Sequence, residues 1–170
     1  MTIELKNYAN DIKLNLSTIL REDPSNALSH NQTLAIALAS SYATKNQDLV
    51  NYILEQAGDK LSDVEIEAAK GAATVMAMNN IYYRFLHLAS NKEYMQLPAK
   101  LRMNFINSHG IDKNDFELYA LAVSVINGCG MCIDAHVKQL EKAEVSKNAI
   151  QDSARIAAVI NATATALTIN

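Results

Sequence analysis

Two cysteines and a histidine lie close together in the second half of the chain, at spacings that suit thiol redox chemistry. Two residues separate Cys129 from Cys132, and His136 follows four residues after the second cysteine. If a helix begins at the first cysteine, both sulfur atoms lie within one turn and can form a disulfide reversibly. The unpaired N–H groups and the dipole at a helix start stabilise thiolate. The imidazole one turn further along can accept a thiol proton.

A carboxylate, Glu117, joins this group if the chain folds back on itself. The Asn-Gly pair just before Cys129 is a turn signal between two helical segments. In an antiparallel helical hairpin, Glu117 and His136 lie at roughly 15 and 12 Å from the turn, since a helix rises 1.5 Å per residue. We therefore expect the carboxylate to orient and charge the imidazole, which deprotonates a thiol. As an alternative, Glu117 is the N3 residue of a capping box that begins near Asn114.

The same order of groups assigns a role to each sulfur. Cys132 has the base beside it, so we expect it to be the peroxidatic thiolate, which meets a peroxide oxygen and becomes sulfenic acid. Cys129 is then the resolving thiol and proton donor, which closes the disulfide and releases water. Because Cys129 lies nearer the turn, we also expect it to be the more exposed sulfur, which an external reductant engages.

The elements that position these groups are predicted to be helices. Between positions 5 and 20, apolar residues recur at three- and four-residue steps, and Pro24 ends this first helix. Ser62 and Glu65 have the spacing of a capping box at the start of a long helix. Further helical segments are predicted over 34–42, 49–57, 62–88, 101–106, 114–126, 129–143 and 147–167. No alternating pattern predicts a strand, so the fold class is all-α.

Composition and charge restrict the protein class. The 170 residues are 49% apolar and 19% charged, as in an ordinary globular domain. The net charge of −3 favours neither nucleic acid nor an anionic membrane as a partner. Neither a signal peptide nor a membrane span is evident, so we expect a cytoplasmic protein, in which structural disulfides are rare. A disulfide between such close cysteines also adds little stability, which favours a redox role.

The chain has a weak internal repeat. A shift of 86 positions aligns Leu54 with Leu140, and it aligns Ala68 and Ala72 with Ala154 and Ala158. We therefore predict a single domain over 1–170, with a degenerate first copy at about 25–95 and a second copy at about 110–170. Only the second copy carries the cysteines and the histidine.

Three stretches of the chain have the sequence of a known group of proteins. They are NDFELYALAVSVINGCGMCIDAH at 114–136, MNNIYYRFLHL at 78–88 and LRMNFINSHGIDKND at 101–115. Together they resemble the AhpD branch of the carboxymuconolactone decarboxylase-like families. Glu117, Cys129, Cys132 and His136 all match the pattern of that branch. One departure is Met131, where members often carry a histidine, and a methionine cannot shuttle a proton.

The resemblance implies an all-helical fold with an internal repeat, assembled as a homotrimer. It also implies reduction of alkyl hydroperoxides without a bound cofactor, and electron donation to the peroxiredoxin AhpC. The implied external reductant is a lipoyl group (dihydrolipoamide) on a dehydrogenase component, recharged by dihydrolipoamide dehydrogenase.

Other interpretations of the same residues remain open. One alternative is a protein disulfide reductase or adaptor with little peroxidase activity, and another is a pair of buried, unreactive cysteines. A metal-holding helical module would need a fourth ligand such as His109, which we otherwise expect to be solvated. A decarboxylase has no use for a dithiol. Tyr82, Tyr83 and Phe85 are predicted to make core or subunit contacts.

Overall fold

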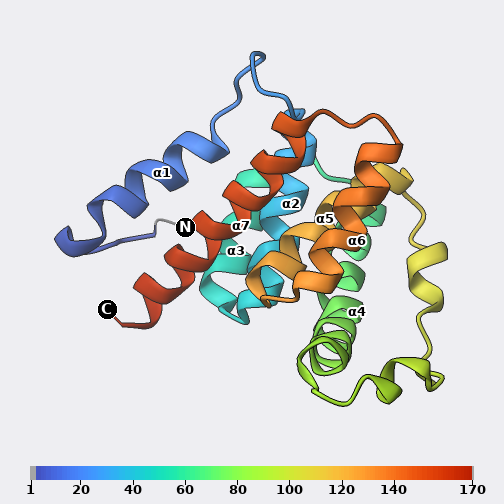
Figure 1. Ribbon diagram of the computed structural model, residues 1–170. Helices are drawn as coiled ribbons and strands as arrows, with labels where there is room; N and C mark the ends of the chain where they lie inside the picture. The colour runs from blue at the N-terminus through green and yellow to red at the C-terminus, as the bar shows by residue number, and fades with distance from the viewer. Residues whose placement is uncertain (1–2, 170) are drawn as a thin grey trace.

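The described part of the protein is entirely helical. A computed structural model describes residues 3–169, which form seven α-helices and three short 3-10 helices and contain no strand (Figure 1). The all-α prediction is therefore confirmed. No helix within this range is long and apolar enough to cross a bilayer. The α-helices are α1 (Asn10–Leu20), α2 (His30–Thr44), α3 (Gln47–Ala57), α4 (Asp63–Leu88), α5 (Lys113–Ile126), α6 (Gly130–Lys142) and α7 (Lys147–Thr168).

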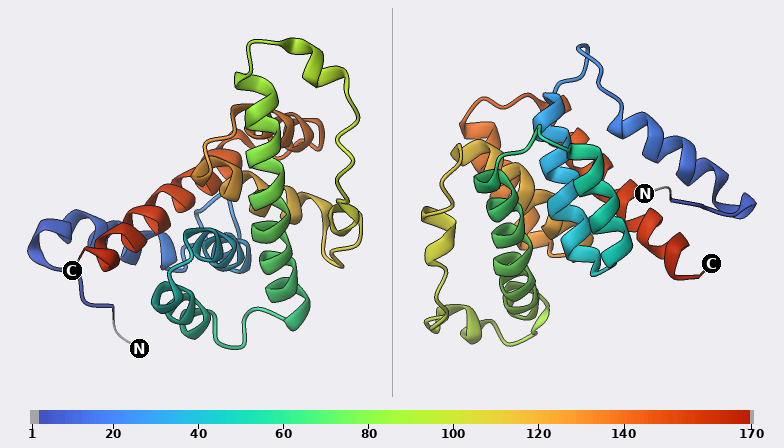
Figure 2. Two further views of the ribbon diagram at one scale, coloured as in Figure 1. Left: turned by 90° about the horizontal axis from the view of Figure 1, so that it is seen from below. Right: turned by 180° about the vertical axis from the view of Figure 1, so that it is seen from behind.

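Two helices, α2 and α5, form the centre of the bundle. Both are buried along most of their length, because their sequences are apolar or small on every face. Helix α2 packs against α3, α4, α5 and α7, and α5 packs against α2, α4, α6 and α7. Helix α1 lies at the edge, along α7 (Figure 2). Of the site residues predicted above, Glu117 lies on the central helix α5, and Cys132 and His136 lie on α6, which packs against α5.

The long helix α4 crosses the α5–α6 pair and supplies one wall of the region around the cysteines. It begins at the predicted capping box: the Ser62 hydroxyl accepts the Glu65 N–H, and the Glu65 carboxylate accepts the Ser62 N–H at 2.8 Å. A similar box at Ser29 starts α2 at His30, four residues before the predicted start. A capping box satisfies N–H groups that the first helical turn leaves unpaired, so it sets where each helix begins.

The connection from α4 to α5 passes around the outside of the bundle (Figures 1 and 2). It contains the 3-10 helices η2 (Lys92–Gln96) and η3 (Asn104–Asn107). The short helix predicted over 101–106 forms only in part, as the 3-10 helix η3. The Phe105 ring packs so closely on α4 at Gly71 that a Cβ atom on this glycine would overlap it. The position of this segment thus depends on side-chain packing against α4, which local periodicity does not report.

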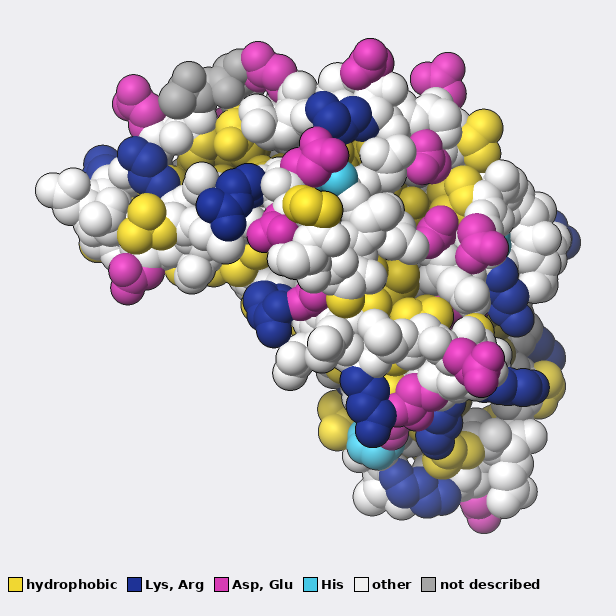
Figure 3. Space-filling view, turned by 90° about the horizontal axis from the view of Figure 1, so that it is seen from above, with side chains coloured by type: hydrophobic (Ala, Val, Ile, Leu, Met, Phe, Trp, Pro, Cys, Tyr) yellow, Lys and Arg dark blue, Asp and Glu magenta, His cyan; other side chains and the backbone are white. Residues whose placement is uncertain are grey.

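The order of helix lengths is compatible with the predicted repeat. The helices α2, α3 and α4 have 15, 11 and 26 residues, and α5, α6 and α7 have 14, 13 and 22, so each set ends with its longest helix. The repeat itself stays a prediction. On the face shown in Figure 3, acidic and basic side chains are interspersed, as the small net charge suggests.

Candidate active site

A sharp reversal of the chain between α5 and α6 positions the two cysteines. Gly128 has a φ of +65°, in the left-handed region that favours glycine. The Cys129 N–H donates to the Ser124 carbonyl at 3.2 Å, so the chain turns back directly after α5. The predicted turn and the predicted helix start are both confirmed: Cys129 is the N-cap of α6, which begins at Gly130.

A disulfide joins Cys129 and Cys132 across the first turn of α6, and their Cα atoms lie 5.3 Å apart. The Cys129 Sγ also accepts the Cys132 N–H at 3.3 Å. This N–H is one of the groups that a helix start leaves free, and in the reduced protein it can stabilise a thiolate at Cys129. The pair can therefore cycle between dithiol and disulfide within one helical turn.

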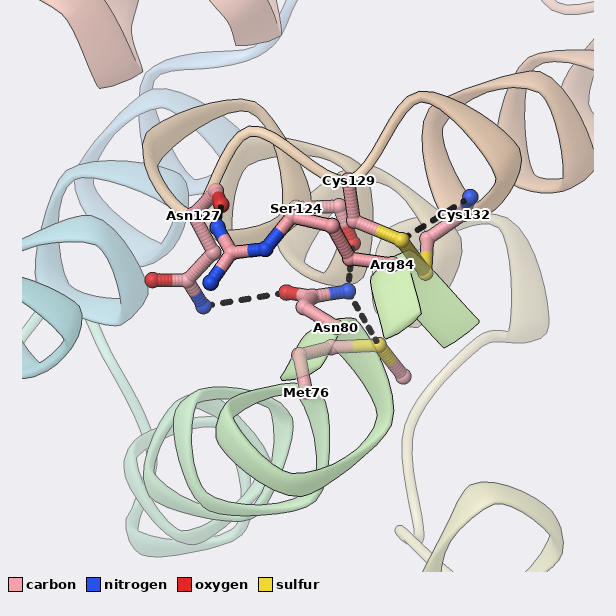
Figure 4. Close-up of a disulfide and its surroundings, with 7 residues drawn as sticks. All are labelled: Met76, Asn80, Arg84, Ser124, Asn127, Cys129 and Cys132. Atoms are coloured by element: carbon pink, nitrogen blue, oxygen red, sulfur yellow. Dashed lines mark hydrogen bonds between the residues drawn. A yellow bond between two sulfur atoms is a disulfide. The ribbon is translucent and has the colours of Figure 1, made fainter. Parts of the chain in front are cut away.

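The two cysteines differ in exposure, and the prediction that Cys129 is the more exposed is wrong. Cys129 is 0% exposed, whereas Cys132 is 7% exposed. The reason is the position of α4. Its side chains Asn80 and Arg84 lie against the turn that carries Cys129 and cover it (Figure 4). Cys132, one turn into α6, instead faces an open cavity.

Glu117 and His136 face each other across the hairpin. The His136 Nδ1 lies 2.7 Å from the Glu117 Oε2, and both side chains are mostly buried, at 14% and 12% exposure. Since an ionised carboxylate has no proton to give, Nδ1 is the donor, and a neutral ring keeps its lone pair on Nε2. The predicted juxtaposition is confirmed. The capping alternative is wrong, because Asp112 is the N-cap of α5 and accepts the Asn114 N–H.

His136 and Cys132 open onto the same cavity, which has a volume of about 300 Å³. From residue 3 to residue 169, no hydrogen bond joins the His136 imidazole to either sulfur; the two side chains share the cavity wall without direct contact through a hydrogen bond. The wall is mostly apolar and comes from α4, α6 and the segment around η3. Its members are Met76, Asn79, Tyr83, Met103, Ile106, Met131, Cys132, Ala135 and His136.

The α4 members of this wall are the functional residues that the sequence did not reveal. Met76, Asn79 and Tyr83 are three and four positions apart, so they share one face of the helix. The spacing could have indicated that face, but not what it lies against. Tyr83, which was expected to make core or subunit contacts, lines the cavity. Met131, in place of the usual histidine, also lines it.

A buried polar network holds the turn in place from the α4 side (Figure 4). The Asn80 amide donates to the Ser124 hydroxyl at 2.9 Å and accepts from the Asn127 amide at 3.0 Å. Arg84 donates to the Asn127 carbonyl at 2.6 Å. Because Asn80 is fully buried, these bonds satisfy an amide that would otherwise be unpaired. The network fixes the start of α6, and with it both sulfur atoms.

His109, the fourth ligand that a zinc site would need, stacks its ring on Phe116 with centroids 4.2 Å apart. The side chain stays partly exposed, in keeping with the expectation that it is solvated. Burial lowers the pKa of His109, although Glu117 and Asp112 oppose this effect. Over residues 3–169, no three His, Cys, Asp or Glu side chains gather as metal binding would require.

The fold and this site define a helical dithiol oxidoreductase, and similarity to known proteins agrees. Residues 92–169 match the Carboxymuconolactone decarboxylase family. An alkyl hydroperoxide reductase AhpD of Coxiella burnetii is 56% identical over 158 residues, which cover 93% of this chain and 89% of that protein. The AhpD of Brucella abortus is 47% identical over 164 residues, which cover 96% of this chain and 92% of that protein. The AhpD of Rhodopseudomonas palustris is 47% identical over an alignment of 172 residues, which covers 98% of this chain and 93% of that protein. The chain therefore belongs to the AhpD family of alkyl hydroperoxide reductases.

Proposed function

We propose that this chain is an antioxidant thiol peroxidase, which reduces alkyl hydroperoxides through a dithiol/disulfide cycle and supplies electrons to the peroxiredoxin AhpC. One observation carries the proposal. The Cys132 sulfur lies in the wall of an apolar cavity that also contains the imidazole of the Glu117–His136 pair. Such a cavity accepts an alkyl group, and it holds the nucleophile and the base together.

In the first step, His136 takes the proton of the Cys132 thiol, directly or through one water. Glu117 stabilises the imidazolium that forms, because its carboxylate already holds Nδ1. The thiolate attacks the terminal oxygen of the hydroperoxide, a sulfur–oxygen bond forms, and the oxygen–oxygen bond breaks. The imidazolium returns its proton to the departing alkoxide, which leaves as an alcohol. Cys132 is now a sulfenic acid, and the peroxide has gained two electrons.

In the second step, Cys129 resolves the sulfenic acid. Its sulfur attacks the Cys132 sulfur, the disulfide forms, and the hydroxyl group leaves as water after taking the Cys129 proton. In relatives with a histidine before the second cysteine, that side chain is available for such a transfer. Met131 cannot replace it, so Cys129 itself is the proton donor here.

The external reductant engages Cys132, the more exposed of the two sulfurs. A dithiol such as dihydrolipoamide attacks the Cys132 sulfur, and Cys129 leaves as a thiolate at the helix start, where the Cys132 N–H stabilises it. The second thiol of the reductant then displaces Cys132 and closes the reductant's own disulfide. The lipoyl group belongs to a dehydrogenase component that dihydrolipoamide dehydrogenase recharges. No cofactor stays bound to this chain.

The setting of this activity is also part of the proposal. Membership of the AhpD family supports a cytoplasmic homotrimer, whose subunits each contain the two-copy repeat with the site in the second copy. The partners are an organic hydroperoxide, AhpC and the lipoyl-bearing component, and neither nucleic acid nor a membrane is required.

Counting free thiols tests the cycle. We expect the reduced wild type to lose both thiols on addition of one equivalent of cumene hydroperoxide, and Cys132→Ser to keep its remaining thiol. Cys129→Ser should instead accumulate a sulfenic acid at Cys132, which dimedone traps. If Cys132→Ser loses its thiol as fast as Cys129→Ser does, the assignment of the peroxidatic cysteine is wrong.

A second experiment separates a peroxidase from an adaptor. With dihydrolipoamide as donor, the wild type should consume cumene hydroperoxide without any other protein, and added AhpC should increase the rate. Consumption that requires AhpC at every peroxide concentration would identify a disulfide reductase and refute the peroxidase.

A further inference from the structure

The cavity beside Cys132 is lined by methionines that the dithiol cycle does not use. In this structure Cys132 is bonded to Cys129, so its sulfur is no longer a thiolate that can attack a hydroperoxide. Met76, Met103 and Met131 belong to the same cavity wall. A thioether keeps its lone pairs in every redox state of the cysteines, and oxidation converts it to methionine sulfoxide. A hydroperoxide that enters the oxidised protein therefore meets thioethers in place of the thiolate.

The three methionines differ in burial and in the element that carries them. Met76, on α4, is only 2% exposed, and its Sδ accepts a weak hydrogen bond from the Asn80 Nδ2 at 4.0 Å. Met103 is half-buried and belongs to the segment that leads into η3. Met131 is also half-buried, and it lies in the first turn of α6, the helix that carries Cys132. Met131 thus combines access with a position on the helix of the reactive sulfur.

Met131 lies on the cavity face of α6. Ala135 follows it by four residues and lines the same wall, so the two side chains are one turn apart on one face of the helix. Cys132 is the next residue in the chain and opens onto the same space. A hydroperoxide that brings its oxygen–oxygen bond to the first turn of α6 therefore approaches both sulfur-containing residues.

We propose that Met131 is a regulatory oxidation site: when the reductant is exhausted, a hydroperoxide in the cavity of the disulfide form converts Met131 to methionine sulfoxide. The thioether sulfur attacks the terminal oxygen, so a sulfur–oxygen bond forms and the oxygen–oxygen bond breaks. The proton of the terminal oxygen passes to the departing alkoxide, which leaves as an alcohol. The thioether gives two electrons to the peroxide, and no other reactant is consumed. While the dithiol is present, the Cys132 thiolate is the stronger nucleophile and consumes the peroxide first.

The sulfoxide lowers the activity of the site. Its oxygen is polar and lies in a wall that is mostly apolar, so the alkyl body of the substrate binds less well. Dihydrolipoamide reopens the disulfide and leaves the sulfur–oxygen bond in place. A methionine sulfoxide reductase is needed to restore the thioether. Met131 therefore records an episode in which the peroxide outlasted the supply of reductant.

Peptide mass mapping tests the modification. The disulfide form of the wild type is treated with excess cumene hydroperoxide, with and without a larger excess of dihydrolipoamide. Without reductant, Met131 should gain one oxygen atom about tenfold faster than Met95, and with reductant it should stay unmodified. Met95 is the internal reference, because it is 48% exposed and lies outside the cavity wall. Oxidation governed by exposure alone would give the opposite order and would refute the proposal.

Activity after the same treatment tests the consequence. The treated protein is reduced with dihydrolipoamide, and its kcat/KM for cumene hydroperoxide is compared with that of the same protein before treatment. The wild type and the control Met95→Leu should each lose about tenfold, and a methionine sulfoxide reductase should reverse the loss. Met131→Leu keeps an apolar side chain without the sulfur, and it should lose nothing relative to its own untreated value. If it loses as much as the wild type, oxidation of Met131 does not control the site.

The inference rests on the proposed function, and the two fail differently. If the reduced wild type does not lose its thiols to cumene hydroperoxide, the proposed function is wrong. If the thiols are lost and Met131 is oxidised no faster than Met95, only the role of Met131 is refuted. Peptide mapping needs no turnover, so it gives this result whatever the rate of the peroxidase cycle.

Discussion

Replacing Glu117 by glutamine removes the charge from the carboxylate–imidazole pair and keeps its geometry. In the wild type, the His136 Nδ1 lies 2.7 Å from the Glu117 Oε2. The glutamine oxygen can still accept the hydrogen bond that this nitrogen donates. In the variant, the imidazolium keeps a hydrogen bond to the neutral amide but loses the ion-pair attraction of the carboxylate. A loss of about 1.4 kcal/mol in the stabilisation of the imidazolium corresponds to a tenfold lower rate.

The assay is stopped-flow measurement of thiol loss in the reduced protein with cumene hydroperoxide. Near neutral pH the second-order rate constant of Glu117→Gln should be about tenfold below that of the wild type. The deficit should shrink as the pH rises and disappear above the ordinary thiol pKa of about 8.5, since hydroxide then ionises the thiol without help from the imidazole.

Asp134→Asn is the control, because it neutralises an exposed carboxylate on α6 only two residues from His136. It should keep the wild-type rate at every pH. If Glu117→Gln instead has the same pH–rate profile as the wild type, the carboxylate does not act through the imidazole, and the proton path from Cys132 must be a different one.

Three further predictions concern the framework of the site. Asn80→Leu should lower the free energy of unfolding by about 2–4 kcal/mol in urea denaturation, because it leaves the buried Ser124 hydroxyl and the partly buried Asn127 amide unbonded. His109→Gln should lose less thermal stability than the wild type as the pH falls below about 6.5. Burial lowers the pKa of His109 in the folded protein, so the unfolded chain binds the proton more readily. Acid therefore favours unfolding of the wild type, and the variant lacks this effect. Equal losses would contradict this linkage. Gly71→Ala should displace the Phe105 ring and with it the η3 wall of the cavity, which lowers kcat/KM for cumene hydroperoxide although alanine favours the helix. An unchanged kcat/KM would mean that the ring moves without moving η3.

Much of the site could be predicted because its parts lie near one another in the sequence. The Cys129–Cys132 pair and the start of α6 depend on a turn and a helix cap that neighbouring residues form. The meeting of Glu117 with His136 follows from the same turn, because two helices that reverse at one point bring residues at similar distances from it together. Sequence alone therefore predicted the cysteine pair at the helix start and the meeting of Glu117 with His136.

Tertiary structure decided which surfaces these groups face. The residues of α4 that contact the turn lie more than 40 positions before it in the sequence. The packing of this helix buries Cys129 and leaves Cys132 open to the cavity. The same packing separates two adjacent asparagines: Asn80 is bonded into the turn, whereas Asn79 lines the cavity. A helical pattern shows which residues share a face of a helix. Which other helix packs against that face depends on segments far away in the sequence, so the local pattern does not predict it.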